Sequence, residues 1–159
     1  MKNNKGMTLV EIIIVVAILS IISAAGVIGV GMITGRPAQE CAIKLKSTIS
    51  SNRTSALGKK SCDLTISSDG TYVYAVETIN GTAGNSQVIG TKNVKAEYSL
   101  DGGASYTDLT GGSVTFSFDR SDGSLKGMDS DIVFRITKNT TVYQVRIYHL
   151  TGKVEAEKQ

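Results

Sequence analysis

A long apolar run extends from Met7 to Ile33, and Glu11 is its only charged residue. As an α-helix these residues would cover about 40 Å, whereas the hydrocarbon core of a bilayer is about 30 Å thick. The run is therefore long enough to span a membrane. An ionised carboxylate at the bilayer centre costs roughly 2.5–3.5 kcal/mol, so Glu11 indicates a role beyond simple anchoring.

A short polar segment, residues 1–6, precedes the run and contains Lys2 and Lys5, whereas Arg36 is the only base close behind it. The positive-inside rule then predicts a cytoplasmic N-terminus and an outer part made of residues 36–159. The apolar core of a cleaved secretory signal is only about 7–15 residues long. The length of this run therefore argues against ordinary signal-peptide cleavage.

Helical periodicity returns after Thr34-Gly35-Arg36-Pro37, where proline predicts a break or kink. Over residues 38–57 the apolar side chains share one helical face. They are Ala38, Cys41, Ala42, Leu45, Ile49 and Ala56. The pattern predicts an amphipathic helix that packs on one side and ends near Gly58.

Beyond Lys60 the period changes to two, and turn residues separate short runs. The expected strands are Cys62–Ser67, Tyr72–Thr78, Val88–Ile89, Val94–Leu100, Ser113–Phe118, Ile132–Thr137, Thr141–Leu150 and Lys153–Ala156. Residues 81–90 otherwise read as a loop. Alternation in the strand from Thr141 predicts that Tyr143, Val145 and Ile147 point inward. We expect an α+β fold in which about seven antiparallel strands follow the helix, and the helix covers one sheet face.

The segment Lys5-Gly6-Met7-Thr8-Leu9-Val10-Glu11, followed by the apolar run, resembles the N-terminus of type IV prepilins and secretion pseudopilins. The resemblance implies cleavage between Gly6 and Met7 by a membrane-embedded prepilin peptidase, and N-methylation of the new amine of Met7. It implies a structural subunit without a cofactor. The implied partners are other pilin or pseudopilin subunits, the peptidase and methyltransferase, the membrane assembly platform and, before assembly, the lipid bilayer.

Helix spacing gives Glu11 a physical role of its own. Cleavage after Gly6 would leave a cationic amine on Met7, and Glu11 would lie about 6 Å further along the helix. Between two staggered chains, the amine of one can meet Glu11 of the next, and such a buried pair fixes one register. The alternative is a surface-displayed binding domain on an uncleaved signal anchor, with Glu11 at the membrane edge.

The expected organisation has four parts: a leader (1–6), a transmembrane assembly helix (7–33), its amphipathic continuation (34–58) and an antiparallel β-rich extracytoplasmic domain (59–159). Together they would form a long helix packed on a globular domain, the lollipop form of pilins. Residues 38–156 also loosely resemble H-type minor pseudopilins, which have a two-sheet domain. We expect a single-pass protein of the inner membrane that joins a cell-surface or envelope filament. The sequence leaves open whether that filament serves secretion, adhesion and motility, or DNA uptake.

Two cysteines, Cys41 and Cys62, lie in the part expected outside the cytoplasm, where disulfides persist. An unbroken helix would place Cys41 about 24 Å from its own end, close to which Cys62 begins. Because a bridge needs Cα atoms within about 7 Å, we favour two buried thiols and keep a disulfide as the alternative.

Acidic residues Asp119, Asp122, Asp129 and Asp131 gather around a glycine turn and are candidate calcium ligands, although their spacing matches no known calcium loop. Acidic side chains in turns more often cap their own backbone. His149 is expected to be a surface or strand-end residue. No catalytic constellation is visible, so we expect no enzyme. The net charge is only +3, and the basic residues are scattered along the chain rather than clustered, so the charge does not support nucleic-acid binding.

Overall fold

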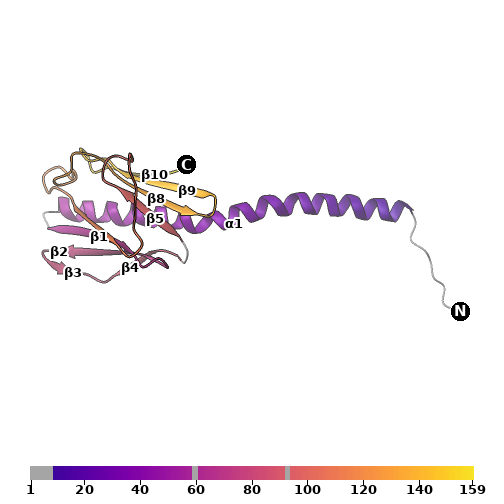
Figure 1. The fold of residues 1–159 in the computed structure, drawn as a ribbon, viewed down its shortest axis with the longest axis horizontal. Coiled ribbons are helices and arrows are strands. Elements are labelled where there is room, and N and C mark those ends of the chain that lie inside the picture. Colours follow the sequence, from indigo (N-terminus) through magenta and orange to yellow (C-terminus); the bar gives the residue numbers. More distant parts are fainter. Residues whose placement is uncertain (1–8, 59–60, 92–93) are drawn as a thin grey trace. The chain divides into compact units, whose positions relative to one another are not determined.

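The computed structural model describes residues 9–58, 61–91 and 94–159, and the side chains of these residues except 21–34. The chain forms two compact units, Met1–Thr34 and Gly35–Gln159. One helix, α1 (Leu9–Leu57), contributes residues to both (Figure 1). The second unit contains the strands.

In the first unit, residues 9–20 of α1 are all exposed. The large apolar side chains among them are Leu9, Val10, Ile12, Ile13, Ile14, Val15, Val16, Ile18 and Leu19. The hydroxyl of Ser20 donates a hydrogen bond to the Val16 carbonyl oxygen at 2.8 Å, so this polar group is satisfied within the helix. A contiguous apolar surface of this kind usually marks contact with a protein or a membrane.

A separate finding concerns membrane spans. Within residues 9–58, 61–91 and 94–159, the structure contains no helix with the length and hydropathy that crossing a bilayer requires.

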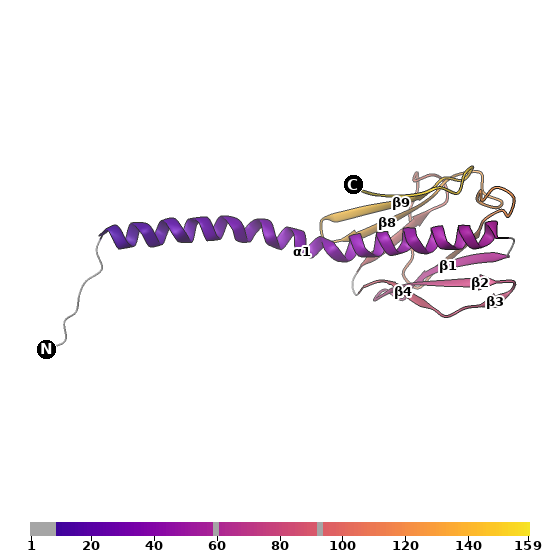
Figure 2. The ribbon, with the colours of Figure 1, turned by 180° about the vertical axis from the view of Figure 1, so that it is seen from behind.

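The second unit contains two five-stranded sheets whose ladders are antiparallel. The first has the order β3 (Thr82–Ala83), β2 (Val73–Ile79), β1 (Cys62–Ser68), β7 (Ser113–Ser117), and β4 (Gln87–Gly90) also pairs with β2. The second has the order β10 (Val154–Lys158), β9 (Thr141–Ile147), β8 (Ile132–Lys138), β5 (Lys95–Ser99), β6 (Thr107–Asp108). In Figures 1 and 2, β1, β2, β3 and β4 of the first sheet lie below the second half of α1, and β8 and β9 of the second sheet lie above it.

Each of the eight predicted strand segments overlaps an observed strand. The sequence missed β3 and β6, which have two residues each and therefore show no period-two pattern. The interpretation of residues 81–90 as a loop is wrong in part, because they contain β3 and β4. The expected α+β fold with antiparallel strands is confirmed, and these strands form two sheets.

Of the break or kink predicted at Thr34–Pro37, the break is wrong, because α1 continues through Pro37, and the kink stays a prediction. Proline inside a helix costs about 3 kcal/mol, since it removes a backbone donor and crowds the preceding turn. Packing directly around this point offsets the cost. Ala38 begins the fully buried face of the helix, and a Cβ on Gly35 would lie 2.7 Å from the hydroxyl oxygen of Thr141 in β9.

The apolar face predicted for residues 38–57 is confirmed, because all six of its members are fully buried. This face reaches both sheets. Cys41 lies close to Gly90 of β4, where an added Cβ would come within 3.0 Å of the sulfur. Gly35 lies similarly close to Thr141 of the second sheet. The second half of the helix therefore shares its core with both sheets.

Aromatic contacts join the two sheets inside this core. The ring of Phe116 in β7 lies 6.2 Å from that of Phe134 in β8, and 6.0 Å from Phe118. The inward orientation predicted for the strand from Thr141 is also confirmed, because Val145 and Ile147 are fully buried and Tyr143 packs against the core.

Arg53 ties α1 to two loops that lie far apart in the sequence. Its Nε donates to the carbonyl oxygen of Gly123 at 3.0 Å, and its Nη2 donates to that of Thr151 at 2.8 Å. Gly152, which follows, has a φ of +62°, and a Cβ there would collide with the Gly123 carbonyl oxygen. Only glycine fits this closely packed turn.

Two isoleucines of α1 test the packing of the helix, because Ile49 is fully buried and Ile43 is 55% exposed. We predict that Ile49→Ala lowers the free energy of unfolding by about 2–5 kcal/mol. Ile43→Ala should change it by no more than about 0.5 kcal/mol. Denaturant unfolding of the full chain in neutral detergent, followed by tyrosine near-UV circular dichroism, measures both. Equal losses would contradict this arrangement of the helix.

Candidate functional site

The assembly residues predicted from the sequence lie at the N-terminal end of the chain. Gly6 and Met7 are outside the residues that the structure describes. Glu11 lies in the first turn of α1 and is exposed. A negative charge is favourable there because the N-terminus of a helix carries a partial positive charge.

Exposed apolar side chains surround Glu11 along the same helix, from Leu9 to Leu19. When a membrane or another chain covers this surface, the carboxylate enters a medium of low dielectric constant, where its interaction with a cation strengthens. A cation that arrives at the correct stagger would then be held firmly, and one at another stagger would not. The arrangement can support selective association between chains.

The two cysteines lie within the second unit. Cys41 belongs to α1 and Cys62 begins β1, and both are buried as thiols. Burial raises the pKa of the Cys41 thiol to about 12, and the nearby charge of Lys44 opposes this only in part. At neutral pH Cys41 is therefore protonated and behaves as a small core residue rather than a nucleophile.

The structure does not bring the four candidate calcium ligands together. Asp119 accepts hydrogen bonds from the backbone and hydroxyl of Ser121, and Asp122 accepts one from the backbone of Ser124. These bonds hold the pKa of both carboxyls below the ordinary value. Asp129 is exposed. Among the residues described, no group of three or more His, Cys, Asp or Glu side chains is placed to hold a metal ion.

Asp131 instead forms a polar cluster that the sequence did not reveal. Its Oδ1 accepts from the backbone N–H of His149 at 2.9 Å and lies 2.8 Å from His149 Nδ1. Its Oδ2 accepts from Arg146 at 3.1 Å. Asp131 precedes β8 and His149 follows β9, and the pairing of Ile132 with Ile147 brings them together. Only the strand register could have predicted this contact.

Two opposing effects act on the pKa of the Asp131 carboxyl. Burial favours the neutral form, but hydrogen bonds from His149 and Arg146 and the charge of Arg146 outweigh it, so the pKa lies below its ordinary value of 3.8. A group with a lowered folded-state pKa stabilises the fold above its ordinary pKa, and that stabilisation is lost as the pH falls toward the folded-state pKa. The cluster therefore holds the loops after β9 and before β8 together at neutral pH.

Comparison with known proteins identifies a family motif at the N-terminal end of the chain. Residues 1–27 match the family described as the prokaryotic N-terminal methylation motif. This is the prepilin cleavage–methylation motif of type IV pilins and pseudopilins, so the N-terminal resemblance seen in the sequence is confirmed. No curated protein and no solved structure matched the chain. The likeness of residues 38–156 to H-type minor pseudopilins stays a prediction.

We predict that Asp131→Asn lowers the free energy of unfolding by about 1–3 kcal/mol at pH 7, because it removes a charged acceptor of three hydrogen bonds. The variant should also lose less stability than the wild type between pH 7 and pH values below 3.8. Denaturant unfolding at both pH values measures the difference. The exposed Asp129→Asn is the matched control and should resemble the wild type. Parallel pH profiles for wild type and Asp131→Asn would refute the assignment.

Proposed function

We propose that this chain is a type IV pilin-like structural subunit, either a minor pilin or a pseudopilin. The observation that carries the proposal is the prepilin cleavage–methylation motif over residues 1–27, with Glu11 in the described first turn of α1. In this proposal a prepilin peptidase cleaves between Gly6 and Met7, and the new amine of Met7 is N-methylated. The chain is a substrate of these enzymes and has no catalytic role of its own.

Before assembly, the apolar helix resides in the cytoplasmic membrane, with its N-terminus on the cytoplasmic side and the second unit outside. The exposed apolar side chains from Leu9 to Leu19 support this step, because water is a poor solvent for such a surface. The membrane assembly platform then moves the subunit from lipid into a filament. The apolar side chains exchange one apolar environment for another during this transfer.

Within the filament, the amine of Met7 from one subunit pairs with Glu11 of its neighbour. Each charge would be costly alone in an apolar filament core, and the pair satisfies both at one stagger. The second unit has a hydrophobic core of its own, which includes the helix residues after Gly35, so it can be carried on the outside of the filament without help from the helix residues of the first unit. The filament serves secretion, adhesion and motility, or DNA uptake.

A surface-displayed binding domain on an uncleaved anchor is the second candidate. The exposed apolar helix fits an anchor equally well, but an anchor needs neither the processing motif nor a carboxylate at this position. The two candidates therefore differ in what they require of Glu11.

We predict that Glu11→Ala is inserted and processed like the wild type but enters filaments about 100-fold less or worse. Leaving a buried charge without its partner costs about 3–5 kcal/mol, which corresponds to that factor. The measurement compares the subunit in sheared filaments with the subunit in membranes. Glu40→Ala, which removes an exposed carboxylate of the second unit, is the control and should assemble normally. Normal incorporation of Glu11→Ala would contradict the pairing of Glu11 with the amine of a neighbouring subunit, whereas a wild-type chain that stays in membranes and is absent from filaments would favour the anchor.

A further inference from the structure

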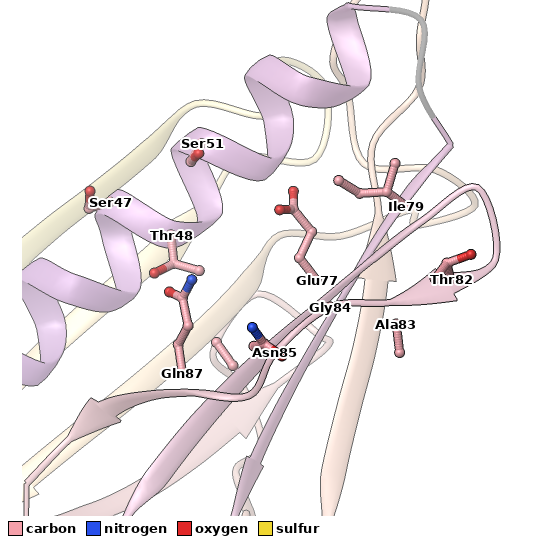
Figure 3. A pocket seen from close by; sticks show the side chains of 11 residues that line it. Ser47, Thr48, Ser51, Glu77, Ile79, Thr82, Ala83, Gly84, Asn85 and Gln87 are labelled. Atoms are coloured by element: carbon pink, nitrogen blue, oxygen red, sulfur yellow. The ribbon is translucent and has the colours of Figure 1, made fainter.

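A groove of about 560 Å³ lies between α1 and the edge of the first sheet, where β2, β3 and β4 meet (Figure 3). The helix contributes Thr48 and Ser51 to its lining, β2 contributes Glu77, and the segment from Thr82 to Gln87 forms the outer wall. Most of these side chains are polar. The groove is separate from Glu11 and belongs entirely to the second unit.

Glu77 occupies an unusual position for a carboxylate. Side chains alternate along β2, and Glu77 lies on the same face as Val73 and Ala75, which are buried in the core. Its side chain extends from the sheet toward α1 (Figure 3). A carboxylate on the inner face of a sheet is costly unless its oxygens are satisfied.

Asn52 of α1 holds this carboxylate in place. Its Nδ2 donates to Glu77 Oε1 at 2.8 Å, and its side chain is 1% exposed. With this orientation Asn52 Oδ1 is buried and accepts no hydrogen bond from the residues that the structure describes. Rotating the amide would bring two acceptors together, so the donor must face Glu77. The buried amide thus positions the carboxylate, while its own oxygen accepts no hydrogen bond from the described residues, which is rare for a buried polar atom.

The lining of the groove carries a negative charge. Glu77 is the only charged residue of its lining, and the described residues form no salt bridge with it. Asn52 occupies one carboxylate oxygen. The lining adds the hydroxyl oxygens of Thr48, Ser51 and Thr82 and the amide oxygens of Asn85 and Gln87. These acceptors are suited to a cation that carries several N–H donors.

We propose that the groove binds a primary ammonium or guanidinium group, with Glu77 as its counter-ion. The group is carried by a free amine or by a lysine or arginine side chain of a second copy of this chain. This proposal does not rest on the filament role of Glu11, because it uses residues of the second unit only.

The test is an NMR titration of the full chain in neutral detergent, observed at the side-chain amide of Asn52. Ethylammonium chloride should cause saturable shifts there. Tetramethylammonium chloride has the same charge but no N–H donor, and should cause none at equal ionic strength. Equal effects of the two salts would overturn the proposal, and this comparison requires no variant.

The same titration of two variants tests whether Glu77 is the counter-ion. Glu77→Gln keeps an acceptor oxygen for Asn52 but removes the charge, so ethylammonium should bind roughly tenfold more weakly or worse. Glu40→Gln removes an exposed carboxylate outside the groove and should bind as the wild type does. Unchanged binding by Glu77→Gln would contradict the assignment of the counter-ion.

A dilution series identifies the source of the cation. If a second copy supplies it, the Asn52 amide should shift as the wild-type concentration rises, and added ethylammonium should reverse the shift. If the ligand is a free amine, the amide should be insensitive to protein concentration and should respond only to ethylammonium. The absence of both responses would refute the site.

Discussion

Between Ala38 and Ala56, α1 presents six apolar side chains that are fully buried, and strands of both sheets lie against them. This contact organises the second unit, because the buried helix face and strands of both sheets share one hydrophobic core. Cys41 approaches β4 of the first sheet, and the helix segment at Gly35 approaches β9 of the second. The same packing stabilises the helix through Pro37, where local propensity alone would end it. Arg53 extends the contact by binding two loop carbonyls.

Much of this arrangement could be predicted from the sequence. Helical periodicity identified the six apolar residues of the buried face, and alternation identified the longer strands, because both patterns report directly on burial. Which strands belong to each sheet could not be predicted, because a period of two does not show which strands pair with one another. The course of the helix at Pro37 depends on tertiary packing in the same way. The two-residue strands β3 and β6 are too short for any pattern.

The candidate functional residues also fall into two groups, those that a local sequence pattern predicts and those that only the tertiary structure brings together. Gly6, Met7 and Glu11 belong to a contiguous motif, so the sequence predicts their roles directly, and all three lie within the match over residues 1–27. The contacts of Asp131 with His149 and of Asn52 with Glu77 join residues 18 and 25 positions apart. Such contacts arise from strand register and helix placement, so no local sequence pattern predicts them. Asn52 in fact continues the buried face of α1, and its polarity conceals this in a search for apolar residues.

The account rests on processing at the N-terminus, because pairing between subunits needs the amine that cleavage creates. Intact-mass and N-terminal peptide mass spectrometry of the protein extracted from membranes of cells that contain prepilin peptidase measures this directly. The account predicts a chain that begins at Met7 and carries an N-methyl group on its terminal amine. A chain that still begins at Met1 and retains residues 1–6 would contradict it.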